Sequence, residues 1–163
     1  MTRVTLKRRL SDWLRRDDGF TRLSYRAGTD PVTAEIGAVS TGLTSYNVQF
    51  TENKPEIPVG CFARDESGRI IAGAHGKLSW GWLYTERLWV DEAYRGKGVG
   101  TEVLARLERV ALAEGIHRFH VGTTSFQALG FYLKQGYEVF AELPDCPPGH
   151  TDYQLKKIID LAP

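Results

Sequence analysis

The clearest pattern of apolar and polar positions lies between residues 99 and 114. Six apolar side chains recur there at helical spacing and form one stripe, made of Val99, Val103, Leu104, Leu107, Val110 and Ala111. Such a stripe predicts an amphipathic helix that packs against a core. Glu102 and Arg106 add a favourable pair one turn apart. Gly115 stands where a left-handed residue commonly follows the last turn of a helix.

Strand patterns precede this helix. Residues 58–65, 69–78 and 81–91 are predicted as three successive strands. The turn at residues 65–68 joins the first two strands as a hairpin. Together these segments predict an antiparallel meander that leads directly into the helix.

The first 18 residues are predicted as a separate basic helix. Leu6, Leu10, Trp13 and Leu14 recur there at helical spacing, among six basic and three acidic side chains. We expect this helix, residues 1–18, to dock by its apolar side on the domain. Binding of a membrane surface or of nucleic acid by the helix is the alternative.

A strand and a second helix are predicted between this segment and the meander. Residues 20–26 alternate as a strand does. Residues 29–31, Thr-Asp-Pro, offer a capping side chain and a proline for the start of a helix over residues 34–46. Gly37 and Gly42 each weaken that helix by about 1 kcal/mol relative to alanine, which predicts two short helices or a bend.

Strands and a helix alternate after residue 115. We predict a strand at 116–123, a helix at 125–135 with Ser125 as its capping residue, and strands at 137–143 and 151–159. A meander followed by such an alternation indicates a mixed α/β (α+β) fold. This pattern extends over residues 20–160.

Length and composition limit the class of protein. A chain of 163 residues predicts one domain over residues 1–163, and 42% hydrophobic with 25% charged residues excludes a disordered or fibrous chain. The formal charge of +1 gives no strong indication of a nucleic-acid partner. Cys61 and Cys146 lack metal-ligand spacing, so we expect no metal site. Without an apolar run of about 18 residues, we expect no transmembrane segment and a cytoplasmic location.

A glycine-rich loop between the third predicted strand and the long helix carries the first chemical signal. Its sequence is Arg95-Gly96-Lys97-Gly98-Val99-Gly100. The glycines leave backbone N–H groups unobstructed, and the start of the helix adds the positive end of its dipole. Two basic side chains add to this, so the loop is suited to bind phosphate or pyrophosphate. The spacing matches neither a Walker loop nor a dinucleotide-binding fingerprint.

Two longer motifs give this loop a context. The first is Leu88-Trp89-Val90-Asp91-Glu92-Ala93-Tyr94-Arg95-Gly96-Lys97-Gly98-Val99-Gly100, and the second is Ser125-Phe126-Gln127-Ala128-Leu129-Gly130-Phe131-Tyr132-Leu133-Lys134-Gln135-Gly136-Tyr137. Both resemble motifs of the GNAT superfamily of N-acetyltransferases, in the family's order and on matching elements. The resemblance covers roughly residues 20–160 and implies that this region is the catalytic core. Ser125 departs from the asparagine that the family often has at that position.

The resemblance implies a fold and a cofactor. The fold is a mixed, mostly antiparallel sheet of about six to seven strands with about four flanking helices, in which two parallel strands separate and hold acetyl-CoA. Those strands correspond to residues 82–91 and 116–123. The implied cofactor-binding residues are Leu88, Trp89, Val90, Arg95, Gly96, Lys97, Gly98, Val99, Gly100, Thr101, Ser125 and Tyr132.

The resemblance also implies catalytic roles. Tyr132 corresponds to the general acid that protonates the departing CoA thiolate, and a backbone N–H near Val90 would polarise the thioester carbonyl. For the general base we first consider Glu86, because period-2 alternation places it on the same strand face as Leu88 and Val90. His75 and His120 are alternative bases, and an exposed Glu86 with only a structural role is also open.

Further residues are candidates for the acceptor side. Trp80 and Trp82 flank a predicted hairpin tip, and aromatic walls commonly shape amine or acyl pockets, although core packing is an alternative explanation. His150 follows a rigid Pro-Pro-Gly segment that often covers the acceptor side in this family.

The resemblance therefore implies an acetyl-CoA-dependent N-acetyltransferase. We expect transfer to a primary amine of a small molecule or peptide in a ternary complex, with a homodimer as a possible assembly. A non-catalytic acyl-CoA-binding regulatory module is the alternative function. The sequence does not identify the acceptor amine, because the fold alone does not determine it.

Overall fold

The computed structural model describes residues 25–51 and 54–160 of the chain. The chain divides into two compact units, residues 1–52 and 53–163. The predicted helix at 1–18 and most of the strand predicted at 20–26 lie outside the described residues. The last two residues of that segment, Tyr25 and Arg26, are not in a strand. The expectation of one domain over the whole chain stays a prediction.

The described part of the N-terminal unit contains one helix, α2 (Thr33–Asn47). It is continuous, so the two short helices that Gly37 and Gly42 predict as one alternative are not formed. It begins one residue before the predicted range, and its N-cap is Val32 rather than one of residues 29–31. The Glu35 carboxylate accepts a hydrogen bond from the Val32 N–H at 3.1 Å. The Glu35 N–H donates in return to the Val32 carbonyl at 2.9 Å. Such bonds stabilise the first turn and help to offset the cost of the glycines.

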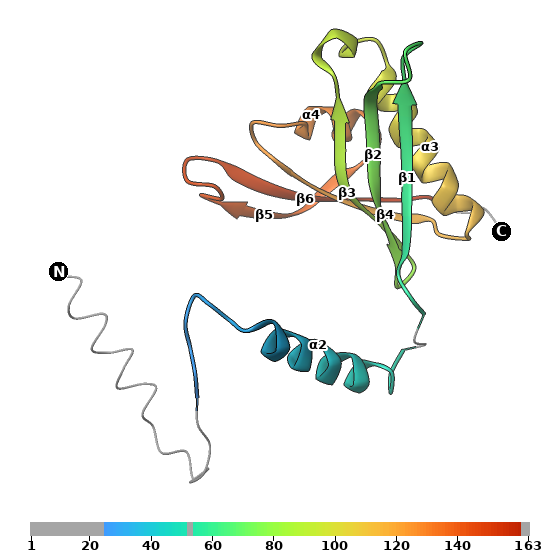
Figure 1. Cartoon of the computed structure of the whole chain (residues 1–163). Coiled ribbons are helices and arrows are strands. Elements are labelled where there is room, and N and C mark those ends of the chain that lie inside the picture. The colour runs from blue at the N-terminus through green and yellow to red at the C-terminus, as the bar shows by residue number, and fades with distance from the viewer. Residues whose placement is uncertain (1–24, 52–53, 161–163) are drawn as a thin grey trace. The chain divides into compact units, whose positions relative to one another are not determined.

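The C-terminal unit is built on one six-stranded sheet (Figure 1). Its strands are β1 (Ile57–Arg64), β2 (Ile70–Ser79), β3 (Trp82–Val90), β4 (Arg118–Thr124), β5 (Glu138–Pro144) and β6 (Thr151–Ile158), in the spatial order β1-β2-β3-β4-β6-β5. Among the strands of the described residues, β3 and β4 alone run parallel, and all other neighbours are antiparallel. The predicted meander and the mixed sheet are therefore confirmed.

Three α-helices are present in the described residues, against about four predicted. The long helix, α3 (Val99–Ala113), packs on β1, β2 and β3. As predicted, Glu102 accepts from Arg106 at 2.6 Å and Gly115 follows with a φ of +75°. The last helix, α4 (Leu129–Lys134), is shorter than the predicted 125–135 and has Ala128, not Ser125, as its N-cap.

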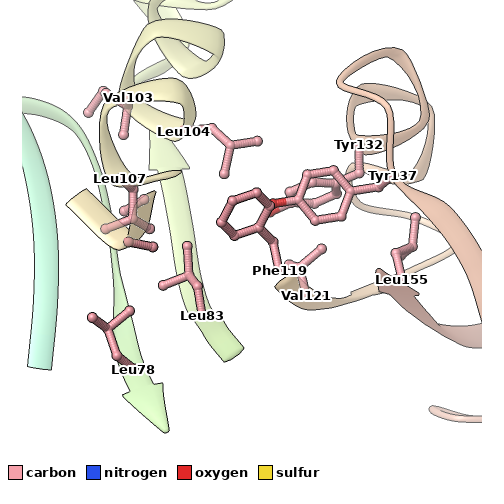
Figure 2. Packing of buried hydrophobic residues seen from close by; sticks show 13 residues of the cluster. Leu78, Leu83, Val103, Leu104, Leu107, Phe119, Val121, Tyr132, Tyr137 and Leu155 are labelled. Atoms are coloured by element: carbon pink, nitrogen blue, oxygen red, sulfur yellow. The ribbon is translucent and has the colours of Figure 1, made fainter. Parts of the chain in front are cut away.

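The core lies between α3, α4 and one face of the sheet (Figure 2). Its fully buried side chains include Leu83, Leu104, Leu107, Phe119 and Leu155. Val110 was included in the predicted apolar stripe but is exposed. A charged group is buried as well: the Glu108 carboxylate accepts from the Tyr137 hydroxyl at 2.9 Å and from Lys157 Nζ at 2.7 Å. These two bonds satisfy a carboxylate whose burial would otherwise be costly.

A β-bulge interrupts the ladder between β2 and β3. His75 pairs with Arg87, whereas the next residue, Gly76, pairs with Thr85, so Glu86 is the extra residue of β3. Gly76 permits this arrangement, because a Cβ at that position would lie only 1.9 Å from the carbonyl oxygen of Tyr84. A bulge re-aims the side chains that follow it.

The bulge changes which residues of β3 share a face. Leu83 and Thr85 are buried before it, and Leu88 and Val90 pack against the same core after it. Glu86 is exposed and contacts His75, which is exposed on the opposite face of the sheet. The prediction that Glu86 shares a face with Leu88 and Val90 is therefore wrong, because the extra residue shifts the alternation by one.

The parallel pair is short. β3 and β4 pair only from Leu83 with Phe119 to Thr85 with Val121. The pairing between the two strands ends at Thr85, although β3 continues to Val90 and β4 to Thr124. The predicted separation of two parallel strands is thus present, and it begins at the bulge.

Candidate active site

A cleft of about 1070 Å³ occupies the gap that β3 and β4 leave. One wall is the end of β3, residues 85–90, and the other contains residues 121–123 of β4 and the segment 126–135 with α4. The loop before α3 lines the remaining end. The two sequence motifs therefore face each other across one cleft.

The glycine-rich loop has the conformation that its sequence predicts. Gly96 and Gly98 adopt φ values of +71° and +81°, which favour glycine, and Gly98 is the N-cap of α3. The first N–H groups of a helix have no partner within it, so they can bind an anion. Gly96, Gly98, Val99, Gly100 and Thr101 all line the cleft.

The two basic residues of the loop have different surroundings. Arg95 lines the cleft, and its Nε donates a hydrogen bond to the Val90 carbonyl at 3.0 Å. Lys97 lies over the ring of Tyr94, with Nζ 5.6 Å from the ring centroid, and lines a smaller depression beside Cys61. Arg95 is therefore the basic side chain of the loop that borders the cleft.

The backbone of β3 offers hydrogen-bond donors to the cleft. The Asp91 N–H donates to the Ile71 carbonyl at 2.8 Å. Asp91 and Ile71 therefore form a hydrogen-bonded pair of the antiparallel ladder. Because such pairs alternate, the N–H and C=O groups of Val90 and Leu88 point away from β2. They point toward β4, which has separated at this level. The bond from Arg95 to the Val90 carbonyl agrees with this direction.

Tyr132 lines the cleft from α4, and 4% of the residue is exposed. Its ring contacts those of Phe131 and Tyr137, with centroids 5.1 Å and 5.7 Å away. Burial raises the pKa of the Tyr132 phenol to about 12, because a charged phenolate would lose its hydration. The hydroxyl makes no hydrogen bond to any described residue, so it is available to a ligand.

Glu86 lines the cleft from the bulge of β3. Its Oε2 lies 3.8 Å from Nδ1 of His75, and both side chains are about half exposed. The structure thus brings together the first candidate base and one of the two alternatives. Water has access to both groups, so a proton that reaches them can leave.

Ser125 has a different environment from the one predicted. Its hydroxyl lies 3.2 Å from Nδ1 of His150 and accepts a bond from the Thr151 N–H at 3.3 Å. Ser125 does not cap α4, because residues 125–128 form turns before the helix. His150 also contacts the ring of Phe126, which lines the cleft. His150 therefore lies directly behind one wall of the cleft.

The two tryptophans at the hairpin tip do not join this site. Trp80 is exposed in the turn between β2 and β3, and Trp82 begins β3. Neither lines the cleft, whereas Leu88, Trp89 and Val90 do.

Several cleft residues were not singled out from the sequence. They include Thr123, Phe126, Gln127, Phe131 and Gln135. Four of the five lie inside the second motif or at its edge, so the motif itself was an available signal. Thr123 had no such signal, and its hydroxyl accepts a bond from the Ala128 N–H at 3.2 Å, which fixes the turn before α4.

Metal and membrane features are not found in the described part of the chain. No group of three or more His, Cys, Asp or Glu side chains there is placed to hold a metal ion. No helix among the described residues is long and apolar enough to cross a bilayer.

Comparison with known proteins shows which family the chain resembles. Residues 32–137 match the family described as Acetyltransferase (GNAT) family. A curated relative, the blasticidin-S acetyltransferase of Streptomyces morookaense, is 40% identical over 107 residues, which are 65% of this chain and 79% of the relative.

Solved structures give the same result. A Bacillus cereus acetyltransferase superposes with a TM-score of 0.76 at 27% identity, over 82% of this chain and 98% of that one. A Bacillus anthracis acetyltransferase in complex with acetyl coenzyme A shares the fold, with a TM-score of 0.58 at 23% identity over 66% and 65% of the two chains. The chain therefore belongs to the GNAT family of acetyltransferases, which use acetyl-CoA.

Proposed function

We propose that this acetyltransferase moves the acetyl group of acetyl-CoA to a primary amine by direct transfer in a ternary complex. The observation that carries the proposal is the placement of two proton-transfer groups on one cleft. Glu86 lines it from the bulge of β3, and Tyr132 lines it from α4. The N–H groups of Leu88 and Val90 point into the space between them.

Each group has a role that its surroundings support. Acetyl-CoA, when bound, supplies a thioester carbon that an amine can attack. Glu86 takes a proton from the substrate ammonium, directly or through water, and so frees the nitrogen lone pair. The β3 N–H groups donate to the thioester carbonyl oxygen and stabilise the charge that develops there.

Tyr132 supplies the proton that the sulfur needs. The C–N bond forms, the C–S bond breaks, and the electron pair left on sulfur takes the phenolic proton. Because burial raises the pKa of Tyr132 to about 12, the phenol keeps its proton throughout the neutral range. The second proton lost by the nitrogen restores the phenol through water.

The acceptor is proposed to be an amine of a small molecule. The 40% identical relative is named for its action on blasticidin S, and the fold is shared with a nourseothricin acetyltransferase at a TM-score of 0.56 and 18% identity. We infer that blasticidin S is the first compound to test. A library of polyamines, amino acids and peptide amines completes the screen, with release of free CoA thiol and mass of the product as readouts.

Replacement of Glu86 by glutamine tests the proposed base. Glu86→Gln keeps size and hydrogen bonding but removes the charge, so we expect turnover with the best amine to fall by about tenfold or more. The loss should shrink at alkaline pH, where more of the amine is already neutral. Glu66→Gln, in the exposed turn between β1 and β2, is the matched control for removal of a carboxylate.

Two outcomes would change the assignment. A pH-independent loss seen only in KM would make Glu86 a binding charge. If turnover is unchanged, the base is another group, with His75 first because it lies beside Glu86.

A further inference from the structure

A chain of three polar side chains crosses β4 and β6 on the sheet face that carries His75 and Glu86. Nε2 of His120 lies 3.0 Å from Oε1 of Gln154. Nε2 of Gln154 donates in turn to the Asp152 carboxylate. None of these residues lies in either sequence motif.

The chemistry of this chain fixes the proton on His120. A carboxylate only accepts hydrogen bonds, so Gln154 must turn its NH₂ group toward Asp152. Its carbonyl oxygen then faces His120 and can only accept. In the neutral imidazole the proton is therefore on Nε2, and Nδ1 carries a lone pair. No described residue donates a hydrogen bond to that Nδ1.

Neighbouring groups hold the imidazole in place. Its ring contacts those of Tyr84 and Phe140, with centroids 5.3 Å and 5.9 Å away. The amide of Gln154 lies over Gly122, since a Cβ on that glycine would be 3.2 Å from its Nε2. A larger residue at position 122 would push the amide away from His120.

This network lies next to the cleft, at the point where the strands separate, although its three side chains are not themselves among the lining residues. His120 pairs with Tyr84 in the short parallel ladder, one pair before its end. Gly122, beneath the Gln154 amide, lines the cleft itself. Glu86 is two residues beyond Tyr84 on β3 and also lines the cleft.

We propose that His120 uses Nδ1 to accept a hydrogen bond from the acceptor amine and thereby orients its nitrogen. The inference rests on the proposed function. An ammonium group carries only donors, so it needs more than one acceptor to be held in a fixed direction. Glu86 takes one proton, His120 holds a second N–H, and the lone pair that is freed then points in a defined direction. Gln154 and Asp152 act through His120 and are positioning residues.

Two replacements of His120 test the role of the lone pair. His120→Phe keeps an aromatic ring against Tyr84 and Phe140 but has no acceptor. His120→Asn places an amide oxygen near the former Nδ1. With blasticidin S, or with the fastest amine of the screen, we expect His120→Phe to raise KM by tenfold or more and His120→Asn to stay within about threefold of wild type. The acetyl-CoA dissociation constant, from calorimetry, should stay within twofold in both variants.

A nuclear magnetic resonance experiment on the full chain tests the network without any reaction. In ¹⁵N-labelled protein, we expect a ring N–H signal from Nε2 of His120, assigned by its absence in His120→Phe. Gln154→Met, which removes the amide but keeps the length, should abolish that signal. His117→Phe is the control for loss of an imidazole outside the cleft.

The possible failures can be told apart. A wild-type protein that acetylates no amine overturns the proposed function and this inference with it. A wild-type protein that acetylates an amine, together with an unchanged KM in His120→Phe, overturns only the role of His120. A protonated Nδ1 in the neutral ring also overturns it, because the acceptor would then be missing.

Discussion

Gly76 is the position at which a single methyl group should disturb both the sheet and the site. In Gly76→Ala, the added Cβ would lie 1.9 Å from the oxygen and 2.9 Å from the carbon of the Tyr84 carbonyl, and 3.0 Å from Cα of Thr85. All three are backbone atoms, so no side chain can turn away to make room. The variant must separate β2 from β3 locally or lose the bulge.

The cost can be worked out from this geometry. Ordinary contact begins at about 3.4 Å, so the strands must open by about 1.5 Å at this point. A ladder bond of about 2.9 Å would lengthen to about 4.4 Å, which is no longer a hydrogen bond. Each buried group left without a partner costs about 1–3 kcal/mol. We expect a loss of about 3 kcal/mol in the free energy of unfolding, or about 6–12 °C in Tm for a chain of this size.

Gly73 on the same strand provides the matched control. An added Cβ there would meet the ring of Phe62 at 2.7 Å and the Cys61 carbonyl at 3.3 Å. Phe62 is an exposed side chain that can rotate away, so Gly73→Ala should cost about 1 kcal/mol or less.

Thermal and urea unfolding of both variants measures the loss of stability. Turnover, measured under conditions where each variant is folded, gives the loss of activity separately. We expect Gly76→Ala to lose at least tenfold in turnover even when folded, because the bulge aims Glu86. The reasoning is refuted if Gly76→Ala unfolds within 2 °C of wild type and keeps its turnover within about twofold.

Two further positions give tests of the cofactor site and of the proposed acid. Gly98→Asp should bind acetyl-CoA more than tenfold more weakly than Gly98→Asn, a difference of about 1.4 kcal/mol. Both variants strain the left-handed backbone, but only the aspartate adds a negative charge. Equal affinities by calorimetry would exclude an anion site. Tyr132→Phe should keep acetyl-CoA affinity and lower turnover by roughly 10²–10⁴, and a loss within about threefold when chemistry limits the rate would require another proton donor. Burial raises the pKa of Tyr132 to about 12, from about 10 in an unfolded chain. The contribution of the neutral phenol to the free energy of unfolding is therefore complete below a pH of about 10 and is lost as the pH rises through about 12. The change is about 3 kcal/mol. Alkaline unfolding of Tyr132→Phe should be correspondingly less steep, and an unchanged curve would contradict the burial argument.

Local patterns predicted the parts of the fold whose causes are local. The apolar stripe of α3 and the glycines that follow α3 and α4 are at the predicted places, because spacing and φ preference act within a few residues. The start of α4 was predicted four residues too early. Ser125 resembles a capping residue, but its hydroxyl interacts with His150 and Thr151, which lie far along the chain.

The sequence motifs predicted most of the residues that line the candidate site. The features of the site that depend on strand pairing were not predicted. Counting alternate residues along β3 placed Glu86 on the wrong face, because the bulge depends on Gly76 in the neighbouring strand. The contact between His120 and Gln154 joins residues 34 apart in the chain. No local pattern reports such a pair, so only the register of β4 and β6 revealed it.

The position of β6 has a consequence for the order in which the protein can be assembled. This strand is the last described element of the chain, yet it lies between β4 and β5. During synthesis, β4 and β5 are made before β6. They are not neighbours in the sheet, so until then β4 has only its three-pair ladder with β3 among the pairings of the folded structure. Their open edges stay exposed to other chains until β6 emerges. The meander of β1 to β3 pairs between sequence neighbours and needs no later segment. The sheet around the cleft is therefore complete only when β6 has paired, although none of its residues lines the cleft.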